Sequence, residues 1–174
     1  MPVKFKQSYA KVWRTYRRVP VSKIPYKRRP WVLDRGSLTK RLIAASDGDF
    51  KVLVTSQQWA KPQRDEQQLL GLALGQHALI REVSLICGSE VWVKARSIIP
   101  VNTLTGPERQ LACLGERPLG AFLFKARTMH RGPLQISSVK SAEGHVISAR
   151  RSIFFIHNKP ILVSEFFMPE IFER

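Results

Sequence analysis

Two charged residues stand on strand patterns that are otherwise apolar. Arg81 lies in a predicted strand at 77–87, where its neighbours on the same face are aliphatic. Glu165 lies in a predicted strand at 161–168 and has apolar neighbours on both faces. A charge on an apolar face is costly unless another charge or a ligand compensates it. The two residues therefore predict a site for a small anionic ligand, and a salt bridge between them or an Arg81 that reaches solvent at a sheet edge are the structural alternatives.

The chemistry of the two side chains suggests a division of roles. A guanidinium presents paired donors that match the geometry of a carboxylate. A carboxylate can accept a hydrogen bond from a substrate hydroxyl or move a proton. We therefore expect Arg81 to bind a carboxylate of the ligand and Glu165 to act on a hydroxyl or a proton.

The tandem Arg150-Arg151 is a second candidate for anion binding. Successive side chains of a strand point to opposite faces, so at most one of the two arginines can face a pocket. The sequence favours an exposed pair at a sheet edge.

Other reactive residue types show no catalytic or metal-binding pattern. The four histidines lack the spacing of metal ligands, and His157 fits a hairpin turn. The serines lack a nucleophile-elbow context, and Cys87 and Cys113 are expected to pack as small apolar residues. Because no glycine-rich phosphate loop or metal motif occurs, we expect chemistry that needs no cofactor and no metal.

Antiparallel strands and short helices must position these residues. The predicted strands are 50–55, 77–87, 90–99, 135–140, 150–157 and 161–168, and the predicted helices are 38–45 behind an Asp34 or Ser37 cap, 105–115 behind a Thr105 cap, and 121–124. Residues 56–68 are polar and are predicted to be a connection. This order indicates an α+β domain with a single antiparallel β-sheet covered by helices.

The connector between the two central hairpins, residues 96–124, contains the corner Arg117-Pro-Leu-Gly. Pro118 removes a backbone donor, and Gly120 permits another group to approach the main chain closely. We expect this corner to form one wall of the pocket.

The charge of the chain is concentrated near its start. Of the 174 residues 29 are Lys or Arg and 13 are Asp or Glu, and residues 1–41 hold thirteen of the basic residues and one acidic residue. We predict a basic N-terminal arm at 1–30 and a catalytic domain at 31–174. The arm could contact nucleic acid or an anionic surface through Coulomb attraction, but a solvated extension is the favoured interpretation.

Length and composition predict a single soluble domain in a reducing compartment. No apolar run approaches the length of a membrane span, and two distant cysteines do not suggest a disulfide framework. We expect a cytoplasmic monomer.

Seven segments, in order and spacing from Trp31 to Pro169, resemble the bacterial chorismate pyruvate-lyase family. They are Leu38-Thr39-Lys40-Arg41, Ile80-Arg81-Glu82, Arg96–Pro100, Leu104–Glu108, Leu114–Phe124, Ala149–Ser152 and Lys159–Pro169. The resemblance implies an α+β fold and the conversion of chorismate to 4-hydroxybenzoate and pyruvate. It also implies that this first step of ubiquinone biosynthesis runs in the cytoplasm without a cofactor.

The resemblance also implies roles for four residues. Arg81 would bind the ring carboxylate, and Glu165 would lie at the 4-hydroxyl end of the ring. Leu119 and Leu38 would contact the substrate or product chiefly through main-chain groups. Arg81 and Glu165 are therefore the expected catalytic residues.

Two other functions fit parts of the sequence. A ligand-binding, effector-sensing domain of bacterial transcription regulators would use the same pocket without turnover, but such regulators carry a helix-turn-helix domain. A short arm interrupted by Pro20, Pro25 and Pro30 is too small to form one. Nucleic-acid binding by the arm would be salt-sensitive and would disappear when residues 1–30 are deleted.

Overall fold

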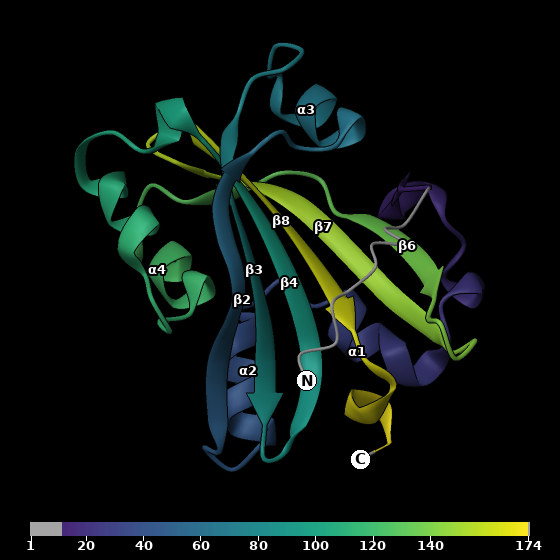
Figure 1. Ribbon diagram of the computed structural model, residues 1–174. Coiled ribbons are helices and arrows are strands. Elements are labelled where there is room, and N and C mark those ends of the chain that lie inside the picture. The colour runs from purple at the N-terminus through teal and green to yellow at the C-terminus, as the bar shows by residue number, and fades with distance from the viewer. Residues whose placement is uncertain (1–11, 174) are drawn as a thin grey trace.

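The computed structural model describes residues 12–173, which form one antiparallel sheet with helices packed against it (Figure 1). The strands are β1 Arg14–Thr15, β2 Phe50–Ala60, β3 Ala78–Cys87, β4 Glu90–Pro100, β5 His130–Arg131, β6 Gln135–Lys140, β7 Val146–Ile156 and β8 Lys159–Phe167. The sheet order is β1-β6-β7-β8-β4-β3-β2, with β5 paired to β7. The predicted α+β class with a single antiparallel sheet is confirmed.

Short helices cover the sheet. The α-helices are α1 Arg29–Val32, α2 Leu38–Ala45, α3 Arg64–Leu70 and α4 Leu119–Lys125, and the 3-10 helices are η1 Tyr16–Arg18, η2 Val21–Lys23, η3 Tyr26–Arg28, η4 Val101–Thr103, η5 Gly106–Cys113 and η6 Pro169–Phe172. Helix α2 begins as predicted, because the Ser37 side chain accepts a hydrogen bond from the Lys40 amide. Helix η5 begins where predicted, but no side-chain hydrogen bond from Thr105 caps it.

The predicted connection at 56–68 is wrong. Strand β2 continues to Ala60 at the edge of the sheet, past a register shift between Val54 and Ser56. Its outer half is polar because an edge strand keeps much of its surface in water. A capping box between Gln63 and Glu66 then starts α3.

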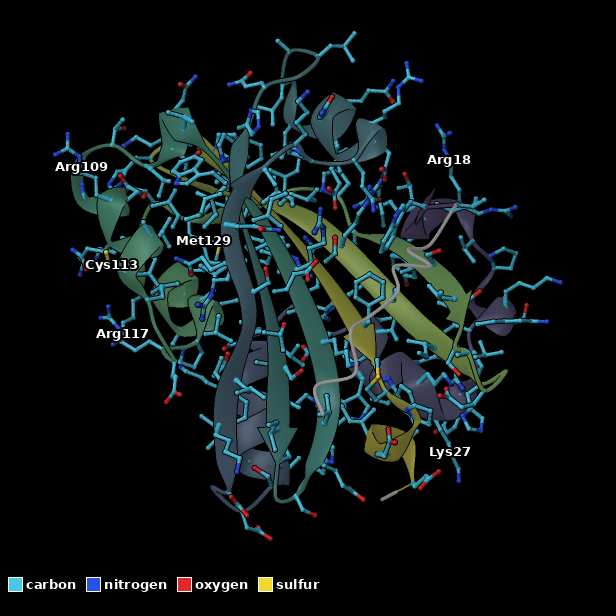
Figure 2. All side chains as sticks on the ribbon, in the orientation of Figure 1. Arg18, Lys27, Arg109, Cys113, Arg117 and Met129 are labelled. Carbon is cyan, nitrogen blue, oxygen red and sulfur yellow. The ribbon has the colours of Figure 1, made fainter. Side chains whose placement is uncertain are left out.

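The part of the basic segment that the structure describes packs against the sheet. Strand β1 pairs with β6, and Ile24 is buried in a core cluster. Arg28 donates hydrogen bonds to the Val146 carbonyl and the Ser148 hydroxyl, whereas Arg18 and Lys27 point outward (Figure 2). The boundary at residue 31 and any nucleic-acid contact stay predictions, and residues 1–11 lie outside the described part.

Two apolar clusters lie on the face of the sheet that α2 and α4 cover. One contains Leu42, Val93 and Phe167. The other contains Leu123 and Ile161. The side chains between the two clusters are smaller or polar, and they form the floor of the site described below.

A buried ion cluster lies on the opposite face of the sheet. Arg96 donates two hydrogen bonds to the Glu66 carboxylate, at 2.8 and 3.0 Å, and one to Glu82 at 2.7 Å. The Arg96 and Glu66 side chains are 7% and 5% exposed, so water screens their interaction little. The cluster joins α3 to β3 and β4.

We expect Arg96→Met to destabilise the fold by about 3 kcal/mol, because it removes the cation that pairs with the buried Glu66 carboxylate. For a chain of this size that lowers Tm by roughly 6–12 °C. Denaturant unfolding measures the change, and Lys51→Met on the exposed face of β2 is the control. Equal stability of the two variants would contradict the structural role of Arg96.

Candidate active site

A pocket lies between α2, α4 and the sheet and encloses about 630 Å³, counting its open mouth. Small side chains on the central strands, Ala95, Ser97 and Val163, form part of its lining. Their size leaves room above the sheet for a flat ring.

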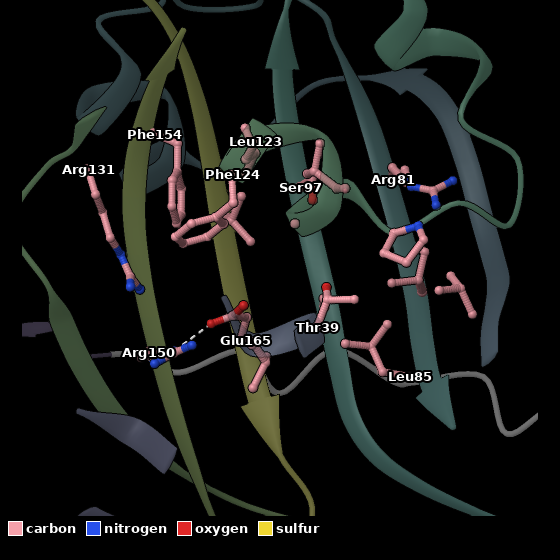
Figure 3. A pocket seen from close by; sticks show the side chains of 18 of the residues that line it. Thr39, Arg81, Leu85, Ser97, Leu123, Phe124, Arg131, Arg150, Phe154 and Glu165 are labelled. Carbon is pink, nitrogen blue, oxygen red and sulfur yellow. Dashed lines mark hydrogen bonds and ion pairs between the residues drawn. The ribbon is translucent and has the colours of Figure 1, made fainter. Parts of the chain in front are cut away.

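The strand register brings Arg81 and Glu165 into this one pocket. One row across the sheet pairs Arg81 with Ser97, and Ser97 with Val163. Glu165 pairs with Ala95 in a row displaced by two residues along the strands. Both side chains line the pocket, as the face assignment predicted (Figure 3).

Arg81 and Glu165 do not form a salt bridge with each other. The Arg81 guanidinium donates to the Gln57 side chain at 3.4 Å and to the Arg117 carbonyl at 3.2 Å, while the Glu165 carboxylate accepts from Arg150. Burial lowers the pKa of Arg81, but a guanidinium stays protonated at neutral pH. The salt-bridge alternative is therefore wrong, and Arg81 is a buried cation held by neutral partners.

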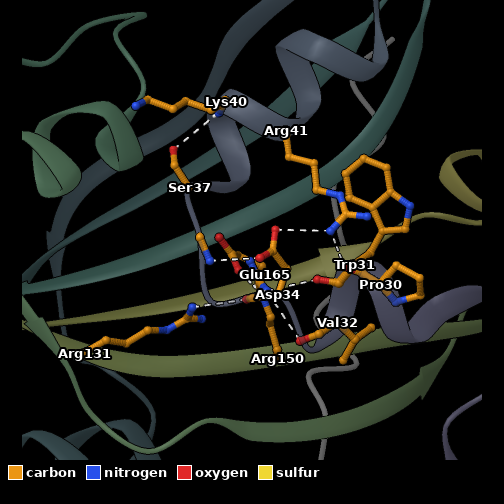
Figure 4. A network of polar contacts seen from close by, with 11 residues as sticks. Pro30, Trp31, Val32, Asp34, Ser37, Lys40, Arg41, Arg131, Arg150 and Glu165 are labelled. Carbon is orange, nitrogen blue, oxygen red and sulfur yellow. Dashed lines mark hydrogen bonds and ion pairs between the residues drawn. The ribbon is translucent and has the colours of Figure 1, made fainter.

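Arg150 holds Glu165 in place. Its Nε lies 2.5 Å from the Glu165 carboxylate, and its Nη1 binds backbone carbonyls, including those of Trp31 at 3.0 Å and Asp34 at 2.5 Å (Figure 4). The Arg150 side chain is 2% exposed. A buried charge with this many partners has one orientation, so the position of Glu165 is fixed as well.

The prediction that Arg150 and Arg151 form an exposed edge pair is wrong. Strand β7 lies between β6 and β8 and is not an edge, so both arginines are buried. The expectation that at most one faces a pocket is confirmed, because Arg151 binds Gln135 and Asp65 outside the pocket.

Arg131 is a pocket residue that the sequence did not indicate, because it stands in a strand of only two residues. Its Nε donates to the Ser152 hydroxyl at 3.0 Å, and its Nη1 approaches the Asp34 carbonyl at 3.4 Å. Burial and the neighbouring charge of Arg150 lower the pKa of Arg131 to about 10. Arg131 and Arg150 therefore form a cationic pair around one carbonyl oxygen.

The two residues that were predicted to contact the ligand through their main chain, Leu38 and Leu119, lie at the start of the helices that cover the pocket. Leu38 is the first residue of α2 and Leu119 is the first residue of α4, and both line the pocket. The N–H of a first helical residue has no acceptor within its helix. These amides are therefore potential donors to a ligand.

The histidines and cysteines do not line the pocket. His157 stands in a hairpin turn as predicted, and its Nδ1 is 2.6 Å from Glu108. Burial opposes ionisation of Glu108, but hydrogen bonds from Lys159 and His157 lower its pKa overall. Cys87 is buried as expected; Cys113 is exposed on η5, so its predicted packing is wrong (Figure 2).

The pocket thus combines Arg81 at one end with Glu165, Arg150 and Arg131 at the other, over a floor of small side chains. The sequence profile named chorismate lyase matches residues 12–174. The chain belongs to the chorismate lyase family. The match begins before Trp31, where the resemblance was expected to start.

Curated relatives agree with this assignment. A protein named "Probable chorismate pyruvate-lyase" from Methylococcus capsulatus is 42% identical over 81% of this chain and 94% of its own length. Proteins of the same name from Halorhodospira halophila and Coxiella burnetii are 38% and 33% identical. The former match covers 94% of this chain and 93% of the relative, and the latter covers 92% of each.

Solved structures with a similar fold include bacterial regulators. A GntR-family transcriptional regulator from Bacillus cereus superposes with a TM-score of 0.55 at 8% identity, covering 70% of this chain and 93% of that one. The C-terminal domain of the histidine utilization repressor from Pseudomonas syringae gives 0.52 at 9% identity, covering 70% and 92%. At these identities the likeness concerns the fold alone. No helix within residues 12–173 has the length and apolar character to cross a membrane.

Proposed function

We propose that this member of the chorismate lyase family converts chorismate to 4-hydroxybenzoate and pyruvate in the pocket between α2 and α4. The observation that carries the proposal is the placement of Arg81 and Glu165, from two distant hairpins, in one pocket. The family and its relatives support the reaction, and the residue roles are our inference from the geometry. This reaction is the first step of ubiquinone biosynthesis.

The reaction makes modest chemical demands on the site. The C3–O bond of the enolpyruvyl ether breaks, C4 loses its hydrogen, and the ring becomes aromatic. The departing enolpyruvate takes up a proton on its methylene carbon and becomes pyruvate. Because aromatisation drives the reaction downhill, the pocket has mainly to orient chorismate and exclude water.

Each predicted residue has a role in this geometry. Arg81 binds the ring carboxylate with paired donors, and the Leu119 amide at the same end of the pocket adds a third. Glu165 accepts a hydrogen bond from the C4 hydroxyl, and the Leu38 main chain, which lines the same pocket, is a further contact. Since C4 also loses its hydrogen, Glu165 lies beside the bonds that change.

Turnover of purified protein tests the proposal. Chorismate is incubated with the protein in buffer containing EDTA, and both 4-hydroxybenzoate and pyruvate are quantified against an Arg81→Ala/Glu165→Gln double variant. We expect equimolar products from the wild type, unaffected by EDTA, and none above the uncatalysed rate from the double variant. A wild type without products would refute the lyase function.

An effector-binding function is the second candidate, because regulators share the fold. It predicts that chorismate or 4-hydroxybenzoate binds without turnover. The same assay, combined with calorimetric titration, decides between the two functions. The monomeric state and cytoplasmic location stay predictions; light scattering at about the 19.9 kDa chain mass would support the former.

The contact between the two covering helices makes a further prediction. A Cβ added at Gly120 of α4 would lie 2.8 Å from the Thr39 Oγ1 of α2. Gly120→Ala should push the helices apart at a cost of about 1–3 kcal/mol and raise the KM for chorismate roughly tenfold. Steady-state kinetics measure the effect.

A second substitution distinguishes the clash from other effects of the alanine. Thr39→Ala removes the clashing oxygen, and the next nearest atom, the Thr39 Cβ, lies at an ordinary 3.8 Å. We expect the double variant Thr39→Ala/Gly120→Ala to recover most of the affinity. No recovery would mean that the helix contact does not close the pocket.

A further inference from the structure

The charges of the pocket exceed what its own residues neutralise. Among the described residues that line it, Arg81, Arg131 and Arg150 carry three positive charges, and Glu165 carries one negative charge. Glu165 is engaged by Arg150 at 2.5 Å. The hydrogen bonds of Arg81 and Arg131 go to neutral oxygens. The pocket is therefore complementary to a ligand with two negative charges.

The two cations without a carboxylate partner come from β3 and β5, which lie on either side of the central strands β4, β8 and β7. The register runs from Arg81 to Ser97, then to Val163 and on to Ser152, whose hydroxyl accepts from Arg131. Three strand spacings separate the backbones at the ends of this row by roughly 14 Å. The side chains of both arginines line the space between, so two separate anionic groups can bind at once.

We propose that Arg131 is the binding residue for the second carboxylate of the substrate, the one on the enolpyruvyl side chain. This inference rests on the proposed function. Chorismate carries one carboxylate on its ring and another on the enolpyruvyl group at C3, next to the hydroxyl-bearing C4. With the ring carboxylate at Arg81 and the C4 hydroxyl at Glu165, the side-chain carboxylate must lie at the Glu165 end.

The surroundings of Arg131 fit this role. In Figure 3 its side chain runs from β5 toward Arg150 and Glu165. Both guanidinium groups approach the Asp34 carbonyl, so the Arg131 charge is held beside a second cation (Figure 4). An anion placed there relieves the repulsion between the two arginines. Arg150 is 2% exposed and already binds Glu165 and backbone carbonyls, whereas Arg131 is half-buried and reachable.

The assignment predicts that Arg131 contributes to the binding of the substrate but not to the binding of the product 4-hydroxybenzoate. The enolpyruvyl carboxylate keeps its charge throughout the reaction, so Arg131 binds substrate and transition state equally and acts on KM rather than on kcat. The product 4-hydroxybenzoate has no second carboxylate. Loss of Arg131 should therefore spare the affinity for 4-hydroxybenzoate, whereas loss of Arg81 should weaken the binding of both molecules.

Steady-state kinetics and calorimetry of Arg131→Met test the inference. We expect the KM for chorismate to rise at least tenfold, kcat to change less than threefold, and the Kd for 4-hydroxybenzoate to stay within twofold of the wild type. Arg131→Lys should recover part of the loss, because it restores the charge. Arg127→Met is the matched control, since Arg127 is exposed, lies in the same segment and does not line the pocket. An unchanged KM, or an equal loss of affinity for 4-hydroxybenzoate, would overturn the assignment.

A modified substrate makes the test independent of how well the variant folds. Chorismate esterified only at the side-chain carboxylate should have a KM at least tenfold above that of chorismate with the wild type. With Arg131→Met the two substrates should differ little. If the wild type does not distinguish them, the assignment is wrong. If the wild-type protein forms no 4-hydroxybenzoate, the proposed function is refuted instead. The affinities of the wild type and of Arg131→Met for chorismate, measured by calorimetry, then test the role of Arg131 by itself.

Discussion

Arg81→Ala is expected to raise the KM for chorismate and the Kd for 4-hydroxybenzoate together, each about 100-fold or more. Removing one partner of a buried charge-assisted contact costs about 2–5 kcal/mol, and each 1.4 kcal/mol is a factor of ten. The Arg81 side chain is fully buried in the pocket wall, and its own partners are an amide and a carbonyl. No other described cation lies at that end of the pocket to replace it.

Two further variants make the Arg81 result specific. Arg81→Lys keeps the charge without the paired donors, so we expect an intermediate loss. Arg109→Ala, on the exposed surface of η5, should change neither constant (Figure 2). If Arg81→Ala binds 4-hydroxybenzoate as tightly as the wild type does, the ring carboxylate lies elsewhere.

Glu165→Gln is expected to lower kcat by about 10²–10⁴-fold, the range of a positioned group that acts on a proton or a hydroxyl in the transition state. The amide keeps the shape of the side chain but loses the charge that faces the reacting end of the ring. It also weakens the 2.5 Å contact that Arg150 makes. The KM for chorismate should change much less than kcat.

Single-turnover kinetics separate this effect from slow product release. Arg150→Met serves as the companion variant. Arg150 is a positioning residue that acts through Glu165, so Arg150→Met should also lower kcat. The double variant Arg150→Met/Glu165→Gln should lose no more activity than Glu165→Gln alone. Thermal unfolding checks that both variants fold. A Glu165→Gln enzyme with kcat within threefold of the wild type would remove Glu165 from the chemistry.

The sequence predicted the positions of residues that follow from the alternation within one strand. It missed the positions that depend on how strands pair with one another. The faces of β3 and β8 follow from alternation, so Arg81 and Glu165 could be assigned before the fold was known. Whether β7 is an edge strand depends on whether β6 pairs with it. The alternation of residues within β7 does not reveal that pairing, so the sequence wrongly predicted that Arg150 is exposed at an edge.

Arg131 and Gln57 illustrate the same limit. Arg131 follows no periodic pattern, because β5 has only two residues. Gln57 stands in the polar outer half of an edge strand, which resembles a loop in composition. Arg131 lines the pocket and Gln57 contacts Arg81 only because the register of neighbouring strands brings them there, and no local pattern reveals that register.

The crystal structure of the protein with bound 4-hydroxybenzoate tests the central claim most directly. Because the pocket has cations at both ends, a monocarboxylate could bind in either direction. We predict the carboxylate on Arg81 and the Leu119 amide, and the hydroxyl within hydrogen-bond distance of Glu165. A ligand with its carboxylate on Arg131 and Arg150 and its hydroxyl at Arg81, or one bound outside this pocket, would contradict the account.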